Sequence, residues 1–349
     1  MKIVVTGNMG YVGPSLVKTL RRNHPAAELV GIDMGYFGHC LTGAQRLPES
    51  ALDCQIIGDV RVAKAEWLEG ADAVVHLAAI SNDPMGKAFE EVTAQINFES
   101  SVELALLARS AGAKSYVFAS SCSVYGYAEG AARDESSELN PLTAYAKSKI
   151  NTEIAVEELA SDSFTVTCLR FPTACGMSER VRLDLVLNDF VASAVATGRI
   201  EILSDGTPWR PLIDTQDMAR AMDWAIQRDG SNGGRFLAVN VGRSEWNYQV
   251  KDLAAAVQVV MPGVDVSINP DAAPDKRSYR VDFSKYAELA PDHLPQVALE
   301  QSITELRAGL ERMGFRDKEF RASDFMRLRV LSGHREQGRL DASLLWNSA

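Results

Sequence analysis

Tyr145 and Lys149 are the residues whose types and spacing most directly predict chemistry. They stand four positions apart in a run, 145–160, that is predicted to be helical, so both side chains lie on one face of that helix. Pro141 and Thr143 mark its start. The lysine ammonium is expected to lower the pKa of the tyrosine from its usual value near ~10. A tyrosine with a lowered pKa is a usable general acid or base.

Ser121 is a third reactive group. It ends an apolar run, 115–119, that is predicted to be a buried strand, and open α/β sheets bind their ligands at the carboxyl ends of strands. A tyrosine and a lysine at this spacing are by themselves common on solvated helix faces. The order along the chain favours the functional interpretation, because a glycine-rich turn, an acidic strand end and the serine strand all precede the helix.

The glycine-rich turn near the N-terminus predicts a phosphate site. Residues 2–6 form a short apolar strand and 14–22 a helix, with Gly7, Gly10 and Gly13 between them. Gly7 permits a tight turn, Gly10 lets a pyrophosphate approach the backbone, and Gly13 allows close helix packing. The spacing is G-x-x-G-x-x-G, not the commoner G-x-G-x-x-G. Any sharp turn needs glycine, so the flanking strand and helix strengthen the interpretation.

Acidic residues follow the next two predicted strands. The strand 28–32 ends in Asp33, which can accept hydrogen bonds from an adenosine ribose and would repel a 2′-phosphate, so NAD is favoured over NADP. The alternative is an ordinary strand-end aspartate. Asp59 and Val60, after the strand 55–58, are either an adenine contact or part of a helix cap.

The strand 73–79 ends in small residues, which let a cofactor lie against the backbone. His76 within it is interpreted as a packed strand residue. Asn97 lies on a long predicted helix, 89–112. It is either neutral there, or it holds a water or a carbonyl near the catalytic helix.

Composition restricts the class of protein. The chain has 349 residues, 46% of them hydrophobic, and a formal net charge of -10, which argues against a general nucleic-acid or anionic-membrane surface but allows a local basic pocket. The cysteine count is odd, and no two cysteines form a Cys-x-x-Cys pair, so no metal or disulfide framework is predicted. No signal peptide precedes the first strand and no apolar run approaches ~20 residues. We therefore expect a reducing, cytoplasmic environment.

Five arginines stand out in the second half of this acidic protein. Most charged runs are solvated faces, but guanidinium groups suit a diphosphate, and these fall in the half that lacks the dinucleotide turn. They predict a second phosphate-bearing ligand. The five are Arg180, Arg182, Arg210, Arg277 and Arg280.

Taken together, these motifs resemble the extended short-chain dehydrogenase/reductase family, in its NAD-dependent nucleotide-sugar epimerase and dehydratase branch, from residue 2 to about 314. The resemblance implies an α/β fold, a Rossmann-type doubly wound parallel sheet with a smaller C-terminal α/β substrate-binding domain. It implies an NAD-binding domain over 1–172 with returning segments at about 210–245, and a mainly nucleotide-sugar-binding domain over 173–316. The polar tail, 317–349, is left without a role. The motifs that match are Gly7/Gly10/Gly13, Asp33, Asp59-Val60, 76–79, 120–126, Tyr145 with Lys149, Leu169-Arg170, Gly206-Thr207 with Arg210, Asp217 and 279–285.

The resemblance also implies roles. Tyr145 would be the acid/base at a sugar hydroxyl, Ser121 would bond the reacting oxygen, and Lys149 would hold the nicotinamide ribose. NAD would take a hydride from a sugar carbon, most often C4. The implied cofactor-binding residues are Gly7, Met9, Gly10, Tyr11, Val12, Gly13, Asp33, Asp59, Val60, Leu77, Ala78, Ala79, Asn97, Ser120, Tyr145, Lys149 and Pro172. The implied substrate-binding residues are Ser81, Ser121, Cys122, Ser123, Tyr145, Thr173, Asn188, Arg210 and Arg277, the two arginines facing the diphosphate.

Departures from the family pattern narrow the reaction. The 4,6-dehydratases of this family carry an Asp-Glu pair where this chain has Cys122 and Ser123, and decarboxylating relatives carry a Glu at the second place. Without a carboxylate for a second proton, elimination is disfavoured, and the run 120–126 looks most like the epimerases. Thr173 stands where many relatives have an Asn that contacts the sugar or phosphate, which leaves the substrate open.

Three functions are compatible with these residues. The first is a nucleotide-sugar epimerase, acting at C4 through a keto sugar and hydride return. The second is a nucleotide-sugar dehydrogenase or ketoreductase with net NAD(H) turnover, with a 4,6-dehydratase less favoured. The third is a non-catalytic NAD-binding sensor or scaffold, which would not need Ser121, Tyr145 and Lys149.

The expected partner is a nucleotide-diphosphate sugar, with no nucleic acid and no membrane. Relatives dimerise through the helices that here begin at 89 and 145, so a homodimer is expected. An apolar stripe is compatible with this interface and equally with packing on the sheet. Its members are Leu104, Leu107, Ala108 and Ala111.

Overall fold

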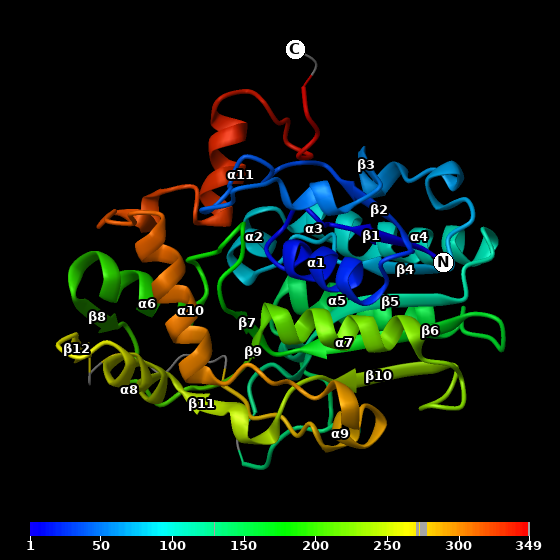
Figure 1. Ribbon diagram of the computed structural model, residues 1–349. Helices are drawn as coiled ribbons and strands as arrows, with labels where there is room; N and C mark the ends of the chain where they lie inside the picture. Colours follow the sequence, from blue (N-terminus) through cyan, green and yellow to red (C-terminus); the bar gives the residue numbers. More distant parts are fainter. Residues whose placement is uncertain (129, 270–271, 273–277, 348–349) are drawn as a thin grey trace.

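A parallel sheet organises the chain. The computed structural model describes residues 1–128, 130–269, 272 and 278–347 (Figure 1). The sheet has seven strands, all paired in parallel, and the order changes direction between β1 and β4. This confirms the predicted Rossmann-type doubly wound fold. Across the sheet the strands are β10 (Phe236–Asn240), β6 (Thr165–Phe171), β5 (Ser115–Ser121), β4 (Ala73–His76), β1 (Lys2–Thr6), β2 (Glu28–Asp33) and β3 (Cys54–Ile57).

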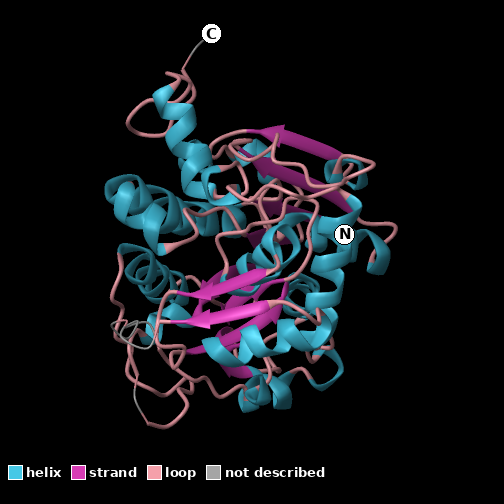
Figure 2. Cartoon of the chain, turned by 90° about the vertical axis from the view of Figure 1, so that its left-hand side faces the viewer, coloured by secondary structure: helices cyan, strands magenta, loops and turns pink. Residues whose placement is uncertain are grey.

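Helices cover both faces of this sheet (Figure 2). On one face α1 (Gly13–Asn23) and α7 (Thr215–Gln227) share a core with the strands, and on the other face α4 (Ser100–Ser110) and α5 (Ala144–Glu157) do so. Burial on both faces explains why the inner strands are mostly apolar and show no strict alternation. Leu104 is fully buried in the second core, as is Ala108, so packing on the sheet accounts for these members of the apolar stripe.

The predicted helix 89–112 is interrupted by a wider turn. It comprises α3 (Glu90–Ala94), a π-helical turn over Gln95–Glu99, and α4. Asn97 lies in the π turn, and such turns frequently occur at functional sites. A short helix, α2 (Asp83–Ala88), precedes it and is capped by the Asn82 side chain.

A smaller unit lies beyond the carboxyl ends of the large sheet's strands. Its three-stranded sheet orders β11 (Asn247–Gln249), β9 (Trp209–Asp214) and β7 (Thr173–Cys175), and a second pair joins β12 (Asp265–Ile268) to β8 (Arg199–Ile202). Three helices share one core with these strands, while α9 (Ser284–Leu289) packs against β10. The three are α6 (Val186–Thr197), α8 (Val250–Val260) and α10 (Leu299–Arg312).

The C-terminal segment, which the sequence analysis describes as a polar tail, contains helical structure and buried leucines. The segment after residue 316 forms a short turn of helix, Phe320–Ala322, and then α11 (Arg327–Glu336). Leu331, Leu340 and Leu344 within it are each at most 3% exposed. Among the residues that the structure describes, no helix is long and apolar enough to cross a bilayer.

Candidate active site

A deep cleft opens between the large sheet and the smaller unit, at the carboxyl ends of the parallel strands. Its volume is about 920 Å³, enough for a ligand of dinucleotide size. Most of the residues predicted from the sequence to bind cofactor or substrate line it. These are Gly7, Gly10, Tyr11, Val12, Asp33, Asp59, Val60, Leu77, Ala78, Ala79, Ser81, Ser120, Ser121, Ser123, Tyr145, Lys149, Pro172, Thr173 and Arg210.

The glycine turn is shaped for a pyrophosphate. Gly7 has a φ of +73°, and a Cβ there would stand 2.5 Å from the backbone nitrogen of Ala78. A Cβ on Gly13 would stand 2.0 Å from the carbonyl oxygen of Asn8, so this glycine packs against the turn and does not face the cleft. Helix α1 starts without a side-chain cap and without an acidic residue in its first turn. Its free N–H groups and positive dipole end therefore fit a dinucleotide pyrophosphate.

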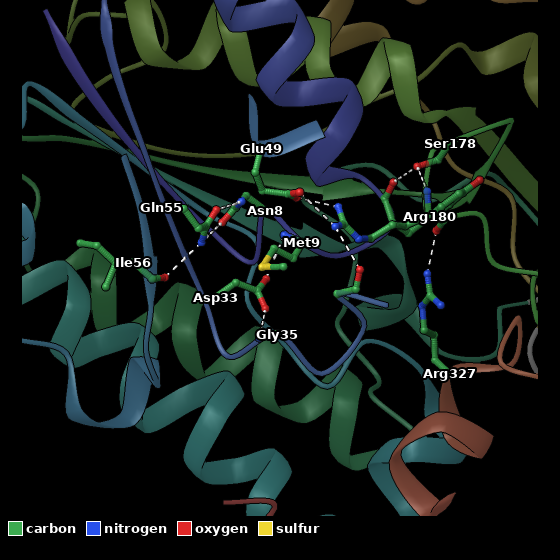
Figure 3. A network of polar contacts seen from close by, with 12 residues as sticks. Asn8, Met9, Asp33, Gly35, Glu49, Gln55, Ile56, Ser178, Arg180 and Arg327 are labelled. Carbon is green, nitrogen blue, oxygen red and sulfur yellow. Dashed lines mark hydrogen bonds and ion pairs between the residues drawn. The ribbon is translucent and has the colours of Figure 1, made fainter. Parts of the chain in front are cut away.

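Asp33 fixes the loop beside this turn. Its carboxylate accepts hydrogen bonds from the backbone nitrogens of Met9, at 3.0 Å, and Gly35, at 2.7 Å (Figure 3). Met9 thus acts through its backbone, and its side chain does not line the cleft. Burial raises the pKa of Asp33, and the two backbone donors oppose that shift. A carboxylate has about four acceptor positions, so capacity remains for ribose hydroxyls.

The three predicted catalytic residues meet in the cleft. Tyr145 lies in the first turn of α5, which Thr143 caps by accepting from the backbone nitrogen of Ala146 at 3.1 Å. The Ser121 hydroxyl, at the end of β5, is a hydrogen-bond partner of the Tyr145 phenol. The Nζ of Lys149 lies 5.6 Å from the centre of the tyrosine ring.

The expected pKa of Tyr145 is corrected by the structure. Burial raises the pKa of Tyr145 to about 12, and the hydrogen bond from Ser121 opposes this only in part. Lys149 is 3% exposed and donates to the carbonyl of Ala119 at 2.7 Å, and burial lowers its pKa to about 7. The cost of burying the phenolate exceeds the stabilisation that Ser121 and Arg182 give it. In the cofactor-free protein Tyr145 is therefore a protonated acid at neutral pH.

A buried ion pair supports these residues from behind. Glu153 Oε2 accepts from Arg170 at 2.7 Å, and Glu153 Oε1 accepts from the Ser120 hydroxyl at 2.5 Å. Arg170 also donates to the Tyr125 hydroxyl at 3.0 Å, which donates to Asn240 at 2.8 Å. The network joins β5, α5, β6 and β10. Sequence reasoning matched Arg170 but missed Glu153, whose position four residues after Lys149 was the available signal.

Glu153→Gln is expected to lower the free energy of unfolding by about 3–5 kcal/mol, because Arg170 is left buried without a counter-charge. Urea denaturation followed by circular dichroism measures the loss. Glu157→Gln, on the exposed side of the same helix, is the matched control and is expected to change stability by less than about 0.5 kcal/mol. Equal stabilities of the two variants would contradict a supporting role for the ion pair.

Two residues predicted to bind substrate lie behind the cleft wall. Cys122 is fully buried, and its Sγ lies 3.1 Å from the Arg170 carbonyl, so the prediction that it contacts substrate is wrong. Asn188 is also fully buried and donates to the Tyr11 hydroxyl at 2.9 Å while accepting from the backbone nitrogen of Gly176 at 3.1 Å. Asn188 positions Tyr11, which does line the cleft. Whether Cys122 and Asn188 reach the cleft depends on the direction of their side chains, which the sequence does not give.

Asn97 was predicted to bind cofactor and instead supports the wall. It is fully buried, and its side chain accepts from the backbone nitrogen of Ile80 at 2.7 Å and donates to the Ile80 carbonyl at 3.0 Å. It also donates to Ser148 on the catalytic helix at 3.2 Å. Of the alternatives for this residue, the structure shows the one in which it holds a carbonyl near that helix.

The arginines separate into structural and cleft-lining groups. Arg180 is fully buried, pairs with Glu49 at 2.6 Å and does not line the cleft, whereas Arg182 and Arg210 do. Arg182 donates to the Ser81 hydroxyl at 3.0 Å and pairs with Asp184 at 3.0 Å. The predicted diphosphate residue Arg277 lies outside the described residues, and Arg280 donates to a backbone carbonyl, that of Gly130.

The sequence reasoning missed several cleft residues. Asp184 accepts from Asn82 at 2.7 Å, so the two sides of the cleft are joined there. Asp83, which accepts from Thr143 at 2.8 Å, also lines the cleft. Ser123, by contrast, was among the predicted substrate-binding residues. Its hydroxyl oxygen is buried and has no hydrogen-bond partner among the residues that the structure describes, which leaves it available to a ligand. Only the short spacing of Arg182 and Asp184 offered a sequence signal.

Comparisons with known proteins agree with this geometry. The chain is 25% identical over 312 residues to the "Uncharacterized UDP-glucose epimerase YtcB" of Bacillus subtilis, covering 87% of this chain and 96% of that protein. It is 28% identical over 272 residues to the UDP-glucose 4-epimerase of Corynebacterium glutamicum, covering 72% and 78%. The solved structure of MoeE5 in complex with UDP-glucuronic acid and NAD superimposes with a TM-score of 0.76 at 23% identity, over 89% of this chain and 99% of that one, which shows the shared fold.

The match to a family model extends beyond the dinucleotide turn. The model of the NAD dependent epimerase/dehydratase family matches residues 3–242, which include the glycine turn, Ser121 and the Tyr145–Lys149 pair. The family resemblance inferred from the motifs is therefore confirmed. The chain belongs to the NAD dependent epimerase/dehydratase family, and NAD is its cofactor.

Proposed function

We propose that this protein is an NAD-dependent epimerase that acts at C4 of a nucleotide-diphosphate sugar, through a transient keto sugar. The observation that carries the proposal is the meeting of Ser121, Tyr145 and Lys149 in the cleft beside the glycine turn. Curated relatives named UDP-glucose 4-epimerase support a uridine diphosphate sugar as the substrate class.

Each residue of the set has a proposed task. Tyr145 moves a proton at the reacting sugar oxygen, and the Ser121 hydroxyl bonds that oxygen. Lys149 holds the nicotinamide ribose and adds positive charge beside the phenol. The Ser123 hydroxyl, which has no partner within the described part of the chain, binds a further sugar hydroxyl. NAD, when bound, supplies the site that accepts and returns the hydride.

Two carboxylates that line the cleft, Asp184 and Asp83, are held by other protein groups, which favours epimerisation over elimination. A dehydratase needs a carboxylic acid that can carry a second proton to or from the sugar. Ion pairing with Arg182 lowers the pKa of Asp184, which therefore stays ionised and bound. Asp83, the first residue of α2, accepts a hydrogen bond at 2.8 Å from the hydroxyl of Thr143, the residue that caps the catalytic helix. Neither carboxylate is therefore available beside Ser121 to carry the second proton of an elimination.

Two further assignments belong to the same proposal. Arg210 lines the cleft at the end where the smaller unit closes it, so we place the substrate diphosphate beside it. A homodimer through α4 and α5 stays a prediction, supported by the 61% exposed side chain of Ile154 on the outer face of α5.

The experiment that tests the function is an assay of the purified protein on UDP-, GDP-, dTDP- and CDP-sugars with catalytic NAD. Proton NMR and mass spectrometry are expected to find a C4 epimer of unchanged mass, formed from a UDP-hexose without net NADH. A product that differs by two hydrogens and follows stoichiometric NAD(H) would replace the epimerase with a dehydrogenase or reductase. Loss of water would show that a cleft carboxylate serves as the second acid.

A further inference from the structure

The C-terminal segment packs on the same residues that form the cofactor cleft. We call residues 317–347 the C-terminal clasp. Its buried side chains Leu331, Leu340 and Leu344 share one hydrophobic core with Tyr36 and Val60. Tyr36 and Val60 also line the cleft. Tyr36 and Val60 therefore lie between the cofactor cleft and the clasp, which supports them from the other side.

Polar contacts fasten the clasp to the loop that follows β2. The Trp346 Nε1 donates to the Met34 carbonyl at 2.8 Å, and its ring lies 5.8 Å from the ring of Tyr36. The Tyr36 hydroxyl donates in turn to the Leu344 carbonyl. His334, on α11, contacts the Tyr36 carbonyl at 3.2 Å. This loop begins directly after Asp33, the residue predicted to bind the adenosine ribose.

A second attachment holds Asp59, which was predicted either to contact adenine or to cap a helix and which caps the helical turn Val60–Val62 in the structure. Arg61 pairs with Asp59 at 2.6 Å and donates to the Ser343 carbonyl of the clasp at 2.7 Å. The clasp thus contacts both loops that flank the adenosine end of the cleft. In Figure 1 it includes the red helix α11 and the red loop that follows it at the top of the view.

The first turn of α11 reaches the cleft itself and joins it to the smaller unit. Met326, Arg327 and Arg329 line the cleft. Arg327 is 1% exposed, donates to the Arg180 carbonyl at 2.7 Å (Figure 3), and lies 4.8 Å from the centre of the Phe37 ring. A single side chain therefore connects the loop after β2 with the segment that follows β7.

We infer that the C-terminal clasp retains the bound dinucleotide by closing the adenosine end of its cleft. The cleft walls cannot separate there unless the clasp detaches, which breaks its shared core and its hydrogen bonds. Release of NAD is then limited by opening of the clasp. Retention suits an enzyme that returns the hydride to the substrate and needs no exchange of cofactor, and this last point rests on the proposed function.

The test measures dissociation of the dinucleotide with no sugar nucleotide present. Full-length protein is loaded with NADH and mixed with excess NAD, and the loss of bound NADH fluorescence gives the rate. Trp346→Ala and Leu340→Ala are each expected to raise the dissociation rate by about tenfold or more, equivalent to about 1.4 kcal/mol. Leu345→Ala, a neighbour whose side chain is 42% exposed, is the matched control and is expected to leave the rate within about twofold.

Equal rates for the wild type and Trp346→Ala would overturn the inference. Trp346 is 39% exposed, so its replacement tests the contact even if the buried Leu340 variant fails to fold. Thermal unfolding of each variant verifies the native state. Slow NADH release from a protein that epimerises no sugar would reject the proposed function and support the role of the clasp. Rapid NADH release from an active epimerase would support the proposed function and reject the role of the clasp.

Discussion

Tyr145→Phe is expected to lower kcat for epimerisation by about 10²–10⁴-fold, the usual contribution of a positioned general acid or base. The phenylalanine ring fills the same space at the start of α5, so the fold and the cleft are retained. The only lost group is the hydroxyl that Ser121 contacts. The affinity for NADH and the KM of the sugar nucleotide are expected to change by less than about threefold, since both depend mainly on other residues that line the cleft.

Tyr279→Phe is the matched control for this prediction. Tyr279 lines the same cleft and is 8% exposed, so its replacement makes a comparable change in volume and polarity. Its kcat is expected to fall by less than about tenfold. Similar losses of kcat in the two variants would contradict the proposed role of Tyr145 as the general acid or base. An ultraviolet titration of wild type against Tyr145→Phe checks the acid itself, since burial raises the pKa of Tyr145 to about 12.

Lys149→Met is expected to abolish turnover and at the same time to stabilise the cofactor-free fold at neutral and acidic pH. Burial lowers the pKa of Lys149 to about 7 in the folded protein, against an ordinary value near ~10.4 in the unfolded chain. Below pH 7 the folded state therefore carries the full cost of a buried charge. Removing it is worth on the order of 3 kcal/mol, after the lost hydrogen bond to the Ala119 carbonyl is allowed for.

The lowered pKa of Lys149 makes the free energy of unfolding depend on pH in a defined direction. Between pH 7 and about 10 the unfolded chain keeps a proton that folded Lys149 has lost, so wild-type stability rises with pH. The advantage of Lys149→Met is therefore largest below pH 7 and shrinks by about 1.4 kcal/mol per pH unit above it. Urea denaturation at several pH values measures the difference. Lys147→Met, at an exposed position of the same helix, is expected to show no such pH dependence.

A stable but inactive Lys149 variant would have a direct physical meaning. The protein would be shown to hold a partly dehydrated ammonium beside Tyr145 at a cost to its own stability, a common property of catalytic sites. A destabilised Lys149→Met with no pH-dependent gain would instead make the lysine a structural donor to β5.

The amino-acid sequence alone determined the large sheet and the chemistry of its edge. Mostly apolar strands without strict alternation, separated by helices, favour a parallel sheet covered on both faces. Three of the signals are local patterns: the glycines of the first turn, Asp33, and the spacing of Tyr145 and Lys149. Local patterns can be predicted from sequence because residues close in sequence are also close in space. These gave the family, the cofactor and the residues that meet beside the glycine turn.

The tertiary structure alone decided which way side chains point and which distant segments meet. Cys122 is adjacent to Ser121 in sequence, but its side chain points away from the cleft toward the Arg170 carbonyl. Asn188, on α6 of the smaller unit, donates to the hydroxyl of Tyr11 in the glycine turn. The pKa of Tyr145 rises because burial outweighs the hydrogen bond from Ser121, and burial is a property of the whole fold. The clasp illustrates the same limit, because Trp346 meets Met34 across 312 residues of chain. Contacts over such separations depend on packing that no local pattern encodes.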